Sequence, residues 1–188
     1  KRCDGCPRSS SKSPLEPWPE GVPRGDPGGA LLVRPILPNE RGAFRCLMEH
    51  HHYLGLRPLV GESLCYAAFW DGELVALSAW AAASLKNRPR DDFIGWQNST
   101  KQQRLHFVVN NVRFLLLPAA SAIENLASRV LAATLRRLSR DWQSCYHHPL
   151  YLAETFVDEA RFRGTCYHAA NWIRLGCTQG FARHGAHY

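Results

Sequence analysis

The spacing of apolar positions separates the chain into a proline-rich start and a region of regular secondary structure. Residues 1–29 contain six prolines among Gly and Ser residues and lack any run of apolar residues. Such a segment is typical of a linker or an extended N-terminal arm. From residue 30 onward apolar runs alternate with amphipathic stretches, so we expect one folded domain over residues 30–188.

Five apolar runs predict β-strands, and a further strand is expected to begin near the end of the chain. The first run contains Pro35, which places it at a sheet edge. Asp71 and Gly72 separate the second and third runs and predict a hairpin turn. The predicted strands cover residues 31–37, 64–70, 74–80, 105–117, 150–157 and 178–182.

Helical spacing of apolar residues predicts three helices. The first covers residues 39–50. The second begins at Asn125, whose side chain is expected to cap it, and the third covers residues 162–175 and ends before Gly176. Residues 81–104 show no regular pattern. The alternation of these elements predicts an α/β (α+β) fold, with a central mixed β-sheet and helices on both of its faces.

Composition narrows the class of protein. With 188 residues, of which 45% are hydrophobic, the chain is long enough for one ordinary core. No apolar run approaches the ~20 residues that span a bilayer, so we expect no membrane partner. Five cysteines stand singly among apolar or helical residues, as free thiols do in a reducing cytoplasm. Cys3 and Cys6 form a lone CxxC, which is either half of a zinc site or part of the linker.

The net charge of +7 favours a polyanionic partner, and its distribution points to the folded domain. Residues 86–113 hold six Lys or Arg against two Asp, and residues 160–188 hold four Arg and no acidic residue. Trp96 lies in the first of these segments, where it either stacks on bases or covers the core. The expected nucleic-acid-binding residues are Lys86, Arg88, Arg90, Trp96, Lys101, Arg104, Arg136 and Arg137.

Two carboxylates bracket the end of the fifth predicted strand. Glu154 and Asp158 are four residues apart, so on a strand their side chains point to the same face. They serve either as a general base with an orienting partner or as metal ligands beside His106 or His52. The structural alternative is that Asp158 caps the following helix while Glu154 pairs with an arginine such as Arg113.

Other polar residues are candidates for a cleft beside these carboxylates, where the central strands of the sheet are expected to splay apart. Asn110 and Asn111 lie in a predicted buried strand, where an amide has to be hydrogen-bonded, and we expect one of them to face the cleft with Arg113. His52 is a candidate proton carrier, and Tyr167 is either a proton donor or a core tyrosine. The candidate catalytic residues are Glu154, Asp158, Tyr167, His52, Asn111 and Arg113.

The order of elements and the C-terminal half of the chain resemble the GNAT acetyltransferase fold. Residues 105–114 are similar to its fourth strand, the helix from Asn125 to its cofactor helix, residues 154–158 to its fifth strand and residues 164–176 to its fourth helix and the following turn. The same part also resembles Mom, a GNAT-like family of phage enzymes that modify adenine in DNA.

The GNAT resemblance implies a coenzyme A site at the start of the helix that follows the fourth strand. A helix N-terminus offers free N–H groups and a favourable dipole to phosphates. The turn over residues 118–125 contains no glycine, however, and Glu124 would repel phosphate. The residues that the resemblance implies for cofactor binding are Asn125, Leu126, Ala127 and Ser128.

Residues 50–183 resemble the DruA domain family more closely. Six blocks occur in order, at residues 51–55, 94–96, 109–114, 125–128, 154–158 and 164–172. DruA domains are found in Druantia anti-phage systems and in insertion-sequence proteins, sometimes attached to a transposase. The family normally continues into another strand, so the resemblance implies either that the last strand is missing near residue 188 or that the sequence has been cut there.

These observations predict a cytoplasmic, DNA-associated domain of an anti-phage defence or transposon system. Its expected partners are DNA and other components of the defence system or a transposase. Whether the domain also acts chemically on DNA stays open at this point. The alternatives are an acyltransferase that uses acyl-coenzyme A and a nuclease that uses a divalent metal.

Overall fold

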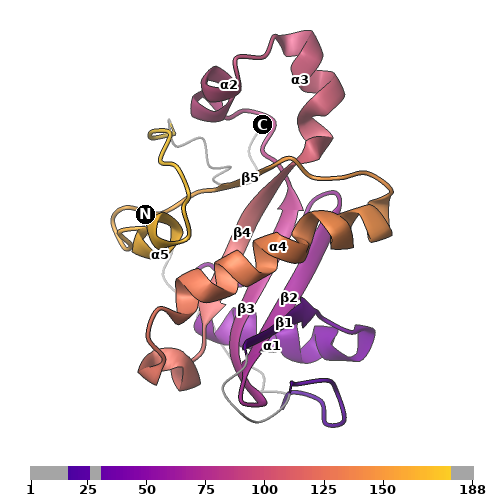
Figure 1. Ribbon diagram of the computed structural model, residues 1–188, viewed down its shortest axis with the longest axis vertical. Helices are drawn as coiled ribbons and strands as arrows, with labels where there is room; N and C mark the ends of the chain where they lie inside the picture. Colours follow the sequence, from indigo (N-terminus) through magenta and orange to yellow (C-terminus); the bar gives the residue numbers. More distant parts are fainter. Residues whose placement is uncertain (1–16, 26–30, 179–188) are drawn as a thin grey trace, which may run out of the picture.

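The computed structural model describes residues 17–25 and 31–178. The CxxC of Cys3 and Cys6 lies outside these residues, as does most of the strand expected at 178–182. The elements in chain order are β1 (Leu31–Pro35), η1 (Pro38–Glu40), α1 (Arg41–His51), β2 (Ser63–Trp70), β3 (Glu73–Ala82), α2 (Arg88–Ile94), α3 (Asn98–Arg104), η2 (Leu105–Phe107), β4 (Val108–Leu116), η3 (Pro118–Ala122), α4 (Leu126–Tyr146), β5 (Leu152–Thr155) and α5 (Thr165–Ala169) (Figure 1).

The described strands form one sheet in the order β1-β2-β3-β4-β5. Neighbouring strands are antiparallel except β4 and β5. These two are parallel because α4 carries the chain back to the end of the sheet at which β4 begins. β1, which contains Pro35, lies at the edge as expected. The β2–β3 turn has positive φ at both Asp71 and Gly72, as the hairpin signal requires.

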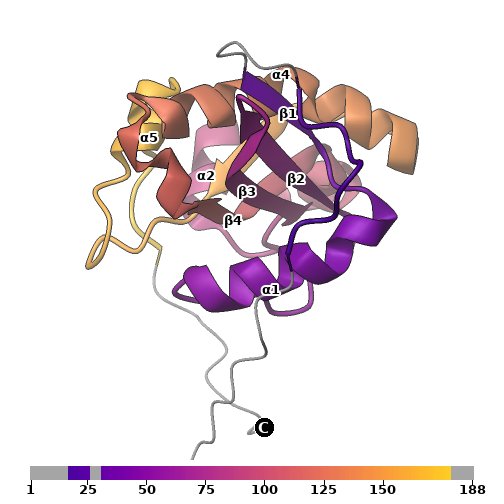
Figure 2. The same cartoon turned by 90° about the horizontal axis from the view of Figure 1, so that it is seen from below.

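Helices cover both faces of this sheet, which confirms the predicted mixed α/β class. α4 lies across one face and α1 across the other, with the sheet between them (Figure 2). On the α4 side, Trp80, Leu126, Val130 and Trp142 belong to one buried cluster. On the α1 side, a second buried cluster contains Phe44, Met48, Phe69, Leu77 and Leu115. None of the described helices is both long and apolar enough to cross a membrane.

Two short helices, α2 and α3, occupy the segment that showed no regular pattern. Asn87 accepts a hydrogen bond from the Arg90 N–H, and a proline lies in the first turn of α2. The apolar residues of α2, Phe93 and Ile94, are exposed, and α3 buries no residue. Neither helix therefore has an apolar face, which is why hydrophobic spacing does not predict them.

Two details of the predicted helices are wrong. Asn125 does not cap α4 with its side chain: it adopts a left-handed conformation (φ 55°), and the Ser128 hydroxyl donates instead to its carbonyl oxygen at 2.9 Å. The helix expected over 162–175 is limited to α5, because Gly164 precedes it and Asn171 follows it with positive φ. A left-handed residue interrupts the right-handed helical backbone.

The described part of the N-terminal segment packs against the domain. The indole N–H of Trp18 donates to the Glu40 carboxylate at 2.9 Å, and its ring meets Phe69 edge to face. Arg34 donates to both oxygens of Glu40, at 2.5 and 2.7 Å, and to the carbonyl of Pro23 at 2.8 Å. Burial alone would raise the pKa of Glu40, but the hydrogen bonds from Arg34 and the Leu37 N–H together hold it below its ordinary value.

We expect Glu40→Gln to lower the free energy of unfolding by about 3 kcal/mol, because Arg34 then stays buried without a charged partner. Urea denaturation followed by circular dichroism measures the change. The matched control is Glu49→Gln on the exposed side of α1, which we expect to change stability by less than ~0.5 kcal/mol. Equal effects of the two substitutions would contradict this role for Glu40.

Candidate functional site

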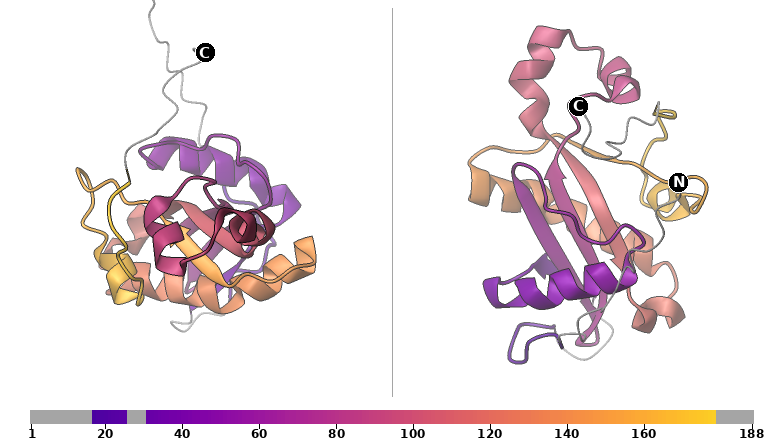
Figure 3. Two further views of the ribbon diagram at one scale, coloured as in Figure 1. Left: turned by 90° about the horizontal axis from the view of Figure 1, so that it is seen from above. Right: turned by 180° about the vertical axis from the view of Figure 1, so that it is seen from behind.

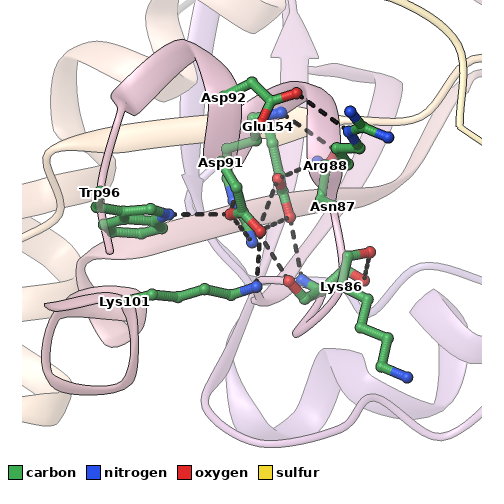
Figure 4. Close-up of polar contacts among 10 residues, drawn as sticks. Lys86, Asn87, Arg88, Asp91, Asp92, Trp96, Lys101 and Glu154 are labelled. Carbon is green, nitrogen blue, oxygen red and sulfur yellow. Dashed lines mark hydrogen bonds and ion pairs between the residues drawn. The ribbon is translucent and has the colours of Figure 1, made fainter. Parts of the chain in front are cut away.

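A buried ion pair joins α2 to the last strand of the sheet. Arg90 is fully buried, and one of its terminal nitrogens lies 3.1 Å from each carboxylate oxygen of Glu154. Glu154 also accepts hydrogen bonds from the Asn87 amide at 2.7 Å and from the Ser84 N–H at 3.0 Å (Figure 4). These contacts connect α2 and the segment after β3 to β5.

Asp91 links this pair to α3. Its carboxylate accepts from Arg90 at 2.7 Å, from the Lys101 ammonium at 2.6 Å and from the Trp96 indole at 3.1 Å. Burial raises the pKa of Asp91, but the hydrogen bonds from Lys101, Arg90 and Trp96 outweigh it and leave the pKa lowered. Two cations and two carboxylates thus form one charge-balanced group, called here the Glu154 cluster: Arg90, Asp91, Lys101 and Glu154.

Some of the residues expected to bind nucleic acid are buried or paired in the structure, and others are exposed. Arg90 is inaccessible, Lys101 is 14% exposed and bound to Asp91, and Trp96 stacks over the Arg90 guanidinium. Arg137 is bound to Asp141 at 2.6 Å and to the Val33 carbonyl. The expected residues that stay exposed are Lys86, Arg88, Arg104 and Arg136.

The outer face of α4 carries further exposed arginines. Arg129, Arg136 and Arg140 are exposed, and their spacing places them on one stripe of the helix. Arg129 also lies 4.4 Å from the centre of the Trp70 ring. The only acidic residue of α4 is Asp141, which is bound to Arg137. No described carboxylate pairs with these three guanidinium groups.

The two carboxylates expected to act together have separate environments. Glu154 is held by the Glu154 cluster, with Arg90 rather than Arg113 as its partner. Asp158 instead stabilises a turn: its side chain accepts from the Ala160 N–H at 3.2 Å and lies 3.5 Å from Arg161. Nowhere in residues 17–25 and 31–178 do three His, Cys, Asp or Glu side chains come together as a metal site.

Asn111 and Tyr167 do come together, on the α4 side of the sheet. The Tyr167 hydroxyl donates to the Asn111 side-chain oxygen at 2.9 Å, and Thr155 lies 3.4 Å from the same hydroxyl. The Asn111 amide donates to the Ala79 and Arg113 carbonyls, across a β-bulge in β4. Burial raises the pKa of Tyr167 to about 12, so the phenol is a hydrogen-bond donor at neutral pH.

His52 and Arg113 meet at the end of α1. Arg113 donates to the Gly55 carbonyl at 2.7 Å, and His52 accepts from the Leu54 N–H at 3.2 Å. Burial, assisted by the Arg113 charge, lowers the pKa of His52 to about 4. The imidazole is therefore neutral at physiological pH. Asn111 and Arg113, although two residues apart, have their side chains in different hydrogen-bond networks.

The residues implied for a cofactor site lie at the start of α4. Leu126 is buried in the core and Asn125 is exposed, with the Ser128 hydroxyl bound to its carbonyl. The preceding segment is the 3-10 turn η3, without a glycine. The Ser128 hydroxyl thus donates its hydrogen within the turn.

Two buried polar atoms in the described residues lack a hydrogen-bond partner: the Asn110 side-chain oxygen and the Trp172 indole N–H. Asn110 lies beside Glu154 in the parallel pair β4–β5.

Sequence patterns did not reveal the Glu154 cluster, because Arg90 is indistinguishable from its exposed basic neighbours. The available local signal was Asn87 followed by Pro89, which is typical of a helix start.

The described residues define an α/β domain with a mixed sheet, a buried charge cluster at one end and an arginine stripe on the long helix after β4. The family model described as Druantia protein DruA matches residues 31–186. The chain therefore belongs to the DruA family, whose name associates it with Druantia anti-phage systems. No curated protein matches the sequence.

We expect Glu154→Gln to destabilise the domain by about 3 kcal/mol, because it leaves the Glu154 cluster with an excess buried positive charge. Asp158→Asn is the matched control, and we expect it to change stability by less than ~0.5 kcal/mol. Chemical denaturation measures both values. An unaltered stability of Glu154→Gln would contradict the anchoring role of this carboxylate.

The lowered pKa of His52 predicts a pH dependence of stability. As the pH falls from 6.5 towards 4, His52 binds a proton in the unfolded chain but not yet in the folded one. Protonation of the unfolded chain favours unfolding, so wild type should lose more stability over this interval than His52→Gln. Denaturation of both proteins at neutral pH and at a pH between the two values tests this, and identical losses would refute it.

Proposed function

We propose that this DruA-family chain is a DNA-contacting component of an anti-phage defence system. The single observation that carries the proposal is the stripe of exposed arginines on α4, namely Arg129, Arg136 and Arg140. No described carboxylate neutralises them. Unpaired guanidinium groups on a rigid helix suit phosphate oxygens, which accept their planar, two-pronged hydrogen bonds.

The length of the stripe fits several phosphates of one duplex. Arg140 lies eleven positions after Arg129 on the helix, which corresponds to a rise of roughly 16 Å. Duplex DNA carries one negative charge per ~1.7 Å of its axis, so an α-helix of this length lies near several phosphates at once. Such contacts give affinity and orientation without reading the base sequence.

Exposed cations at one end of the sheet support the same partner. Lys86, Arg88 and Arg104 lie on or beside α2 and α3, which project beyond the end of the sheet (Figure 3). The Glu154 cluster fixes these two helices against β5, so their exposed cations have defined positions. Arg88 lies 3.4 Å from Asp92, but both side chains are largely exposed, and such pairs contribute little.

The proposal assigns no chemical step. The side chains of Asn111 and Tyr167 are bound to each other and to the backbone, and Glu154 is held by Arg90. Action on DNA therefore stays a prediction from the family resemblance, as does participation in a transposon system. Binding to phosphates requires only the exposed groups.

We expect the double substitution Arg136→Gln with Arg140→Gln to weaken binding to duplex DNA of any sequence. The plot of log affinity against log salt should lose about 0.9 of its slope for each lost phosphate contact. Fluorescence anisotropy with a labelled duplex at several salt concentrations measures both quantities. Neither side chain packs in the core, so the folded state should be retained, which circular dichroism checks.

The matched control is Arg136→Lys with Arg140→Lys, which keeps both charges. We expect it to retain most of the affinity and the salt slope of the wild-type protein. The proposal fails if wild type shows no affinity for DNA at low salt. It also fails if the neutral and the charge-conserving variants bind equally well.

A further inference from the structure

A second concentration of unpaired cations lies on the other side of the sheet, around a cavity of about 640 Å³. β1 pairs only with the second half of β2, so residues Ser63–Cys65 extend past its end. α1 and the segment at 56–59 enclose the space beside this uncovered part of β2. Both the size and the open mouth are typical of small-molecule sites.

The wall of the cavity is apolar where it meets the core. Ile36, Phe44, Leu56, Leu59 and Leu64 line it, and Phe44 is almost completely buried. The Tyr146 hydroxyl closes one side: it accepts from the Ser63 N–H at 2.9 Å and donates to the Ser63 carbonyl at 2.7 Å. The backbone N–H and carbonyl of Ser63 are thereby both satisfied.

Three arginines stand at the mouth. Arg41 and Arg45 are one turn apart on α1, and Arg57 lies on the opposite segment. All three are exposed, and among residues 17–25 and 31–178 none of their guanidinium groups has an ion-pair or hydrogen-bond partner. Glu49 is the single carboxylate that lines the cavity, so cationic groups outnumber anionic ones by three to one.

The thiol of Cys65 also lines the cavity. Burial raises its pKa to about 12, and the opposing effect of the Arg41 charge is smaller. The neutral thiol adds to the apolar wall. The cavity thus combines an apolar interior with a cationic mouth.

We propose that this cavity binds a nucleotide, with the base against the apolar wall and the phosphates at Arg41, Arg45 and Arg57. A heteroaromatic base suits a wall of Leu, Ile and Phe, and guanidinium groups at the mouth suit phosphate oxygens. The nucleotide is either free or the terminal residue of a DNA strand, because both present the same base and phosphate. This site lies on the α1 side and does not depend on the arginine stripe of α4.

The test is direct binding by the complete chain. A fluorescently labelled ATP is titrated with the protein, and unlabelled AMP, ATP, inorganic phosphate and short oligonucleotides with or without a 5′-phosphate compete for binding. We expect saturable binding below about 1 mM, displaced by nucleotides much better than by phosphate alone. Preferential displacement by ATP identifies a free nucleotide, and preferential displacement by the 5′-phosphorylated oligonucleotide identifies a strand end.

Two kinds of variant assign this binding to the cavity. Arg45→Gln and Arg57→Gln should each weaken it about tenfold, because each removes a charged hydrogen-bond donor from an exposed position. Leu59→Trp should weaken it as well by filling the cavity without altering charge. Arg136→Gln on α4 is the control, and it should leave nucleotide binding unchanged.

The proposal is overturned if no saturable binding occurs at about 1 mM nucleotide. It is also overturned if inorganic phosphate competes as well as ATP, or if the arginine and Leu59 variants bind like wild type. These results are independent of duplex binding. Loss of duplex affinity in the α4 variant with intact nucleotide binding supports two separate sites, whereas duplex binding by a protein that binds no nucleotide supports the arginine stripe alone.

Discussion

The buried Arg90–Glu154 pair is the interaction on which the arrangement of the DruA-family domain depends. β5 has only four residues and, within residues 17–25 and 31–178, pairs with β4 alone, while α2 and α3 bury almost no apolar surface of their own. α2 and α3 therefore contribute little to the hydrophobic core, and β5 contributes Ala153. A buried charge that is left without a partner is far more costly than a broken surface pair, so Glu154 and Arg90 hold these elements together.

The opposite edge of the sheet uses the same principle. There the fully buried Glu40 accepts from Arg34, Trp18 and the Leu37 N–H, and so joins β1, α1 and the described part of the N-terminal segment. In both places every carboxylate oxygen has donors, which is the condition for a buried charge to be tolerated. Both edges of the sheet are thus fixed by ionic contacts in addition to the apolar side chains that they pack against the core.

The excess positive charge has two different roles. Arg34, Arg90, Lys101 and Arg137 have carboxylate partners and stabilise the fold. The arginines of the α4 stripe and those at the mouth of the α1-side cavity have none among the described residues. The net charge of +7 therefore understates the local positive potential, because the acidic residues are concentrated at structural pairs and the unpaired cations gather on two separate surfaces.

Sequence patterns by themselves determined the sheet, its edge strand with Pro35, the hairpin at Asp71–Gly72, the two long helices and membership of the DruA family, because these depend on periodicity, turn residues and ordered motifs. They did not determine α2, α3 or the short extent of α5, since these helices lack an apolar face or end at residues with positive φ. Asn111 and Tyr167 were expected at one place and do meet, whereas Glu154 and Asp158 do not. Only the tertiary structure decided which cations are paired, because Arg90 and Glu154 are 64 residues apart and no local signal distinguishes a buried arginine from its exposed neighbours.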